Sequence, residues 1–144
     1  MSDLSTYLTL ENDTPYTLDL ASKSIDHGHW TTDPPSTIDT LKASPFTLTD
    51  DSAAAAGSEG TVVYSITVSD TNEEGGDPVV ATFTVRFCCS YSVDNNYCYF
   101  STSNPKLFAI HFRVKIGEHG VWHDNYCPEG GHPVYAELFI RVLS

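Results

Sequence analysis

The sequence predicts an all-β protein: an antiparallel β-sandwich of about nine strands, in a single domain that spans residues 1–144. Two observations predict this fold class. Apolar and polar residues alternate along several segments, as they do in strands, because successive side chains point to opposite faces of a sheet. Turn-forming residues, such as those in "TDPPS" and "CPEGG", separate these segments.

Nine segments carry the strand pattern. In chain order they are residues 5–12, 16–25, 36–41, 45–50, 61–69, 81–87, 97–102, 107–116 and 133–143. In the segment "LFAIHFRVKI", Phe112 and Val114 share one face, whereas His111 and Arg113 share the other. We expect the first pair to point into the core. Threonine, valine, tyrosine and phenylalanine, which are frequent in these segments, suit a pleated surface.

The charge of the chain limits the classes of ligand that the protein can bind. Seven basic and nineteen acidic residues give a formal net charge of −12. Such a surface repels the phosphates of nucleic acids and the head groups of anionic lipids. The composition therefore predicts no nucleic-acid partner, whereas neutral or zwitterionic lipids and carbohydrates are compatible with it.

The beginning of the chain, "MSDLSTYLTL", has neither the basic region nor the apolar region of a signal peptide. No apolar run approaches the length that is needed to span a membrane. We therefore expect a soluble protein without a signal peptide, located in the cytoplasm or released by an unconventional route.

The stretch "HGVWHDNYCPEGGH", residues 119–132, concentrates groups that ligate metals. A loop that gathered His119, His123, Cys127 and His132 would form a metal site. However, their spacing matches no established ligand pattern, so we expect no metal and no cofactor. The chain also lacks G-x-S-x-G, H-E-x-x-H and a phosphate-binding glycine loop, so we expect a binding protein and not an enzyme.

The four cysteines are Cys88, Cys89, Cys98 and Cys127. A domain of this size does not need them as a disulfide framework, and their spacing is irregular. We favour free, mostly buried thiols. A single bridge between Cys98 and Cys127 is the alternative.

Aromatic and polar residues in or beside the expected loops are the candidate ligand-binding residues. Tryptophan and tyrosine combine an apolar body with a polar tip, which suits a membrane interface or the face of a sugar ring. Loops on a rigid sandwich are also where binding residues usually lie. The candidates are Trp30, Tyr91, Asn95, Tyr97, Tyr99, Trp122, His123 and Tyr126.

Four stretches together resemble the aegerolysin family and its wider actinoporin-like cytolysin relatives. They are "ENDTPYTLDL", "DHGHW", "DPPSTI" and "GSEGTVVY", in this order along the chain. The resemblance implies a small acidic β-protein that binds sphingolipid-containing membranes, often with sterol. It also implies a perforin-like protein partner that forms the pore.

The leading hypothesis is therefore a lipid-binding, cytolysin-like module that acts at membrane surfaces. A lectin-like carbohydrate-binding sandwich is the second hypothesis, because aromatic rings beside Asn and Asp suit sugars equally well. A metal-binding or enzymatic site in residues 119–132 is the third.

Overall fold

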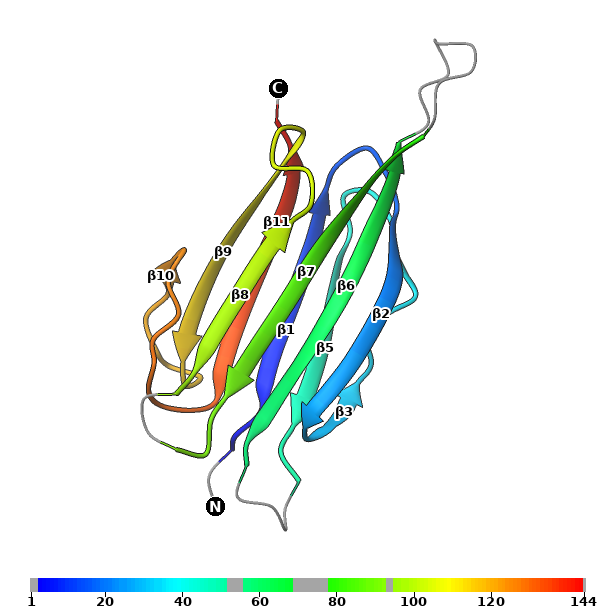
Figure 1. Cartoon of the computed structure of the whole chain (residues 1–144). Coiled ribbons are helices and arrows are strands. Elements are labelled where there is room, and N and C mark those ends of the chain that lie inside the picture. The colour runs from blue at the N-terminus through cyan, green and yellow to red at the C-terminus, as the bar shows by residue number, and fades with distance from the viewer. Residues whose placement is uncertain (1–2, 52–55, 69–77, 93–94, 144) are drawn as a thin grey trace.

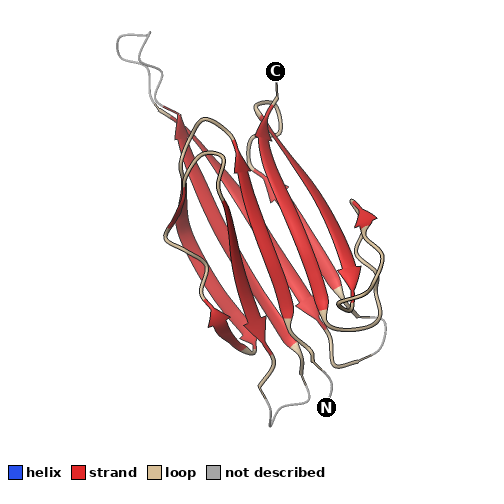
Figure 2. Cartoon of the chain, turned by 180° about the vertical axis from the view of Figure 1, so that it is seen from behind, coloured by secondary structure: helices blue, strands red, loops and turns tan. Residues whose placement is uncertain are grey.

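The computed structural model describes residues 3–51, 56–68, 78–92 and 95–143, and it consists of two β-sheets packed face to face (Figure 1). Every regular element in these ranges is a strand (Figure 2). The predicted β-sandwich is confirmed. The same ranges contain no helix of the length and apolar character that crossing a bilayer requires.

Six strands form one sheet and five form the other. In spatial order, the six-stranded sheet contains β10 (His123–Asp124), β9 (Phe108–Ile116), β11 (Val134–Val142), β1 (Thr6–Asp13), β5 (Ala43–Thr49) and β3 (His29–Thr32). The five-stranded sheet contains β4 (Thr37–Ile38), β2 (Leu18–His27), β6 (Ser58–Val68), β7 (Val79–Cys89) and β8 (Tyr97–Thr102).

The expected antiparallel arrangement is wrong at one pair of strands. β1 and β11 run parallel, with Leu8 beside Ala136, so the six-stranded sheet is mixed. Alternation predicts which face a side chain takes, but it says nothing about the direction of the neighbouring strand. Each of the nine predicted segments contains a strand. The structure adds β3 and β10, which are four and two residues long, too short to show an alternating pattern.

The core lies between the two sheets and follows the predicted alternation. Val62, Tyr64 and Ile66 of β6 are completely buried. In the neighbouring strand β7, Phe83 is also completely buried, and its ring stands edge-on to that of Phe108 at 5.3 Å between centroids. Most of the core side chains are aliphatic or aromatic, which makes burial of apolar surface the main source of stability.

The two ends of the sandwich carry different connections (Figure 1). One end holds the N-terminus, the described residues 90–92 and 95–96 between β7 and β8, and the long loop 117–133 that leads from β9 to β11. The opposite end holds residues 103–107 between β8 and β9, together with the C-terminus. The candidate site lies near the first end.

The difference in burial between Phe83, in the centre of the core, and Phe112, at the side of the sandwich, is testable. Phe83→Ala should lower the free energy of unfolding by about 3–5 kcal/mol, because it leaves a cavity in a closed core. Phe112→Ala should cost roughly half as much, since Phe112 is only half-buried at the side of the sandwich. Urea denaturation of both variants measures the two losses. Equal losses would contradict the placement of Phe112.

Candidate functional site

The candidate site is a groove where the two sheets meet at one side of the sandwich. β8 is the edge strand of the five-stranded sheet, and β9 has only the two-residue β10 on its outer side. The rings of Phe100 in β8 and Phe112 in β9 pack edge-to-face at 4.8 Å across the gap. The groove has a volume of about 260 Å³. It is lined by Asn96, Tyr97, Cys98, Tyr99, Phe112, Asn125, Tyr126, Cys127 and Glu129.

Asn96 fastens one wall of the groove to the other. Its backbone N–H donates to the carbonyl of Glu129 at 2.8 Å, and its side-chain Nδ2 donates to the carbonyl of Gly131 at 2.7 Å. Its Oδ1 accepts from the backbone N–H of Ser90 at 2.8 Å. The buried amide thus joins the β7–β8 connection to the loop 117–133, because Asn supplies both donors and an acceptor.

The local backbone of the loop 117–133 explains why the contact with Asn96 forms there. Gly131 has φ +98°, a left-handed conformation that favours glycine. A Cβ at this position would also lie 2.5 Å from the side chain of Ile116. Midway along the loop, just after β10, the N–H of Asn125 donates to the carbonyl of Phe112 at 2.7 Å. These constraints fold the loop back onto β9.

Two exposed tyrosines flank the groove. Tyr99 is 65% exposed on β8, and Tyr126 is 55% exposed on the loop. Tyr99 stacks on Tyr97 at 5.1 Å between centroids, and the rings of His123 and Tyr126 pack edge-to-face at 5.8 Å between centroids. Rings held by such contacts are pre-ordered, so a ligand that packs on them loses less conformational entropy on binding.

Two further contacts hold Tyr97 in place. Its hydroxyl donates to Glu59, and the Arg86 guanidinium lies over its ring at 5.6 Å. Burial and the bond to Glu59 raise the pKa of Tyr97 well above the usual range, so this tyrosine is neutral at physiological pH. Tyr97 therefore gives Tyr99 a fixed ring on which to stack.

Two thiols face each other inside the groove. Cys98 of β8 donates a hydrogen bond to Cys127 of the loop. This bond, together with burial, raises the pKa of Cys98, whereas it lowers the pKa of Cys127. Cys88 and Cys89 are buried in β7, and burial raises the pKa of each to about 12. All four cysteines are free in the structure.

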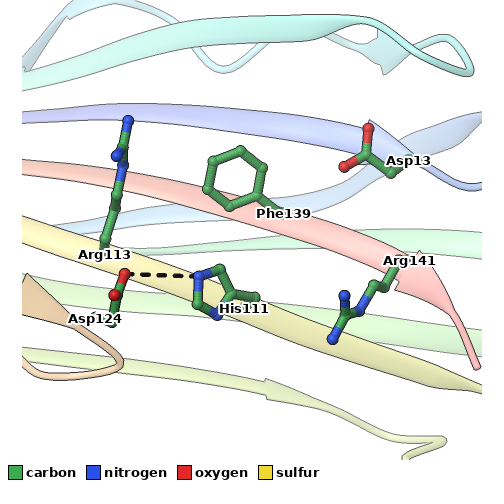
Figure 3. A pocket seen from close by; sticks show the side chains of 6 residues that line it. All are labelled: Asp13, His111, Arg113, Asp124, Phe139 and Arg141. Carbon is green, nitrogen blue, oxygen red and sulfur yellow. Dashed lines mark ion pairs between the residues drawn. The ribbon is translucent and has the colours of Figure 1, made fainter.

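A second hollow lies on the outer face of the six-stranded sheet (Figure 3). Its volume is about 400 Å³, and its lining residues are Asp13, His111, Arg113, Asp124, Phe139 and Arg141. His111 Nε2 lies 3.8 Å from the Asp124 carboxylate, as the dashed line shows. Arg113 is held on Glu137 by Nε and Nη2 at 3.0 and 2.8 Å. The face is an open, mixed-charge surface.

Both tryptophans are half-buried by packing contacts. Trp30 on β3 stands edge-on to Phe46 at 6.3 Å and to Phe87 at 6.2 Å, so it extends the core. Trp122 lies on the outer side of β9, with the Arg113 guanidinium 4.4 Å and the Lys115 ammonium 5.0 Å from its ring. The structure thus places both indoles outside the groove.

The remaining predicted residues lie at the same end of the sandwich. Tyr91 is 60% exposed in the β7–β8 connection, and Asn95 is exposed just before Asn96. The four candidate metal ligands are not gathered. Within the described ranges, no three His, Cys, Asp or Glu side chains lie close enough together to hold an ion. His119, His123, Cys127 and His132 therefore do not form a centre in this structure.

Sequence reasoning missed Asn96 and Phe112 as site residues. Asn96 stands beside Asn95 in "DNNY", and nothing in the sequence separates the buried amide from the exposed one. Phe112 was predicted to be an inward-facing residue of β9, which it is, but its position at the open side follows only from the strand order.

Comparison with known proteins gives similarity in structure without similarity in sequence. No family model matches the chain, and no curated protein matches it in sequence. The fold is similar to that of Nakanori, described as a lipid binding protein, with a TM-score of 0.63 and 11% identity over 97% of this chain and 71% of that one.

Two further solved structures are similar over nearly the whole chain. The RahU protein, in complex with a TRIS molecule, gives a TM-score of 0.61 and 10% identity over 97% of this chain and 96% of that one. IP-1A from Alcaligenes faecalis gives 0.60 and 12% identity over 97% and 91%. At such identities the likeness shows the fold, and the chain shares the β-sandwich of these proteins.

The role of Asn96 leads to a stability prediction. Asn96→Ala should lower the free energy of unfolding by about 2 kcal/mol, because it removes two side-chain hydrogen bonds at a buried position. Ser101→Ala, an exposed change on the adjoining strand β8, should stay within about 0.5 kcal/mol of the wild type. Urea denaturation measures both, and equal small effects would contradict the anchoring role.

Proposed function

We propose that this protein is a membrane-lipid-binding module that has no catalytic activity. In this proposal the protein binds the bilayer interface through the groove between β8 and the loop 117–133. The observation that carries the proposal is the set of exposed tyrosines around that groove and at the adjoining end. They are Tyr91, Tyr99 and Tyr126.

The chemistry of these residues supports an interfacial ligand. A tyrosine ring transfers apolar surface out of water while its hydroxyl stays in contact with lipid head groups. The opposite end of the sandwich also exposes apolar side chains, including Leu41, Leu107 and Leu143. Those side chains have no polar tip. Among the described residues at that end of the sandwich, no exposed tyrosine, tryptophan or phenylalanine lies beside them.

Charge and fold support the same function. A net charge of −12 opposes binding to anionic membranes, so the lipids should be neutral or zwitterionic. The similarity in fold to a protein described as lipid binding is consistent with this proposal.

The finer proposal concerns the lipid and the outcome of binding. The resemblance of the sequence to the aegerolysins supports recognition of sphingolipid and sterol together. It also supports recruitment of a perforin-like protein that opens the pore. On this view the protein alone binds vesicles that contain both lipids, but a dye trapped inside the vesicles is not released.

Co-sedimentation tests the proposal. We expect the protein to pellet with vesicles of phosphatidylcholine, sphingomyelin and cholesterol, and to pellet less with phosphatidylcholine alone. Tyr99→Ala and Tyr126→Ala should each weaken binding about tenfold, because each loses roughly 1–2 kcal/mol of apolar burial. Leu41→Ala, at the opposite end, is the matched control and should bind like the wild type.

Two outcomes would contradict the proposal. Absence of binding to every vesicle composition would leave the groove as a site for carbohydrate, which a glycan array would then test. Loss of binding in Leu41→Ala with full binding in both tyrosine variants would move the contact to the opposite end of the sandwich.

A further inference from the structure

The two groove cysteines come from opposite walls of the site. Cys98 lies on β8 of the five-stranded sheet, opposite Phe87 in the register, so its side chain points between the sheets. Cys127 lies on the loop 117–133, which belongs to the six-stranded sheet through β10. Both residues line the groove and are partly exposed, and the Cys127 thiol is the less buried of the two.

The two cysteines line the same groove of about 260 Å³ from its opposite walls. A hydrogen bond from the Cys98 thiol to Cys127 links the two side chains. A disulfide between them would therefore join segments that already lie side by side. Asn96, two residues before Cys98, fixes the approach through its bonds to Glu129 and Gly131, close to Cys127 in the chain.

We propose that Cys98 and Cys127 are a redox-active pair, which a low-molecular-weight organic disulfide such as oxidised glutathione converts to a disulfide bridge across the groove. The inference rests on the position of both cysteines in one groove, and it is independent of the proposed lipid binding.

The exchange proceeds in two balanced steps. Cys127, whose thiolate the bond from Cys98 stabilises, attacks one sulfur of glutathione disulfide, and the first glutathione leaves as a thiolate. Cys98 then loses its proton and attacks the Cys127 sulfur of the mixed disulfide, which expels the second glutathione. The protein loses two electrons and two protons, and the oxidant becomes two glutathione thiols.

The bridge would covalently join the same two segments that Asn96 joins by hydrogen bonds. It closes a loop from residue 98 to residue 127, which restricts the unfolded chain. We expect the oxidised form to melt about 5–10 °C above the reduced form. Reduction by dithiothreitol should restore the original midpoint.

The test is a thiol count before and after incubation with oxidised glutathione. Acid quenching, alkylation of the remaining thiols and intact-mass measurement give the count, and peptide mapping under non-reducing conditions gives the partners. We expect two thiols to disappear without a retained glutathione and the peptides containing Cys98 and Cys127 to be linked. The Cys88→Ser variant is the control and should react like the wild type.

Single variants separate the two roles. Cys98→Ser should stop at a stable glutathione adduct on Cys127, whereas Cys127→Ser should react much more slowly at Cys98. A bridge that includes Cys88 or Cys89, an unchanged thiol count in the wild type, or an oxidised form that melts below the reduced one would overturn the inference. The wild-type measurement stands even if a variant does not fold.

Discussion

The groove depends on one buried amide. Asn96 donates to Glu129 and Gly131 and accepts from Ser90, so a single residue joins the β7–β8 connection to the loop 117–133. A buried amide of this kind is stabilising only when its donors and acceptor are satisfied, as they are here. Without it, the loop 117–133 would lack these hydrogen bonds to the five-stranded sheet.

The anchoring of this loop divides its side chains between two environments. Trp122 and Asp124 lie on the outer face of β9, where they contact Arg113, Lys115 and His111. The residues that follow, Asn125, Tyr126 and Cys127, line the groove together with residues of β8. The short strand β10 pairs with β9 through only two residues. It lies between the charged outer face of β9 and the groove, which contains aromatic rings and thiols.

The sequence predicts the layers of the fold but only part of the site. Alternation in β6 and β7 identifies the buried faces because burial acts on every second side chain. It does not reveal that β1 and β11 run parallel, because direction depends on strands far apart in the chain. The sequence singles out aromatic residues in or beside the loops, yet it does not reveal that Trp30 and Trp122 pack on neighbouring side chains. An indole in a turn-rich segment looks the same in sequence whether it is packed or free.

The account places the lipid contact at the groove, and hydrogen–deuterium exchange tests this placement most directly. The measurement compares the protein alone with the protein on vesicles of phosphatidylcholine, sphingomyelin and cholesterol. The account predicts slower exchange in residues 95–100 and 119–132, with no change in residues 38–43 and 103–107 at the opposite end. Protection confined to the opposite end, or to the outer face of the six-stranded sheet, would contradict it.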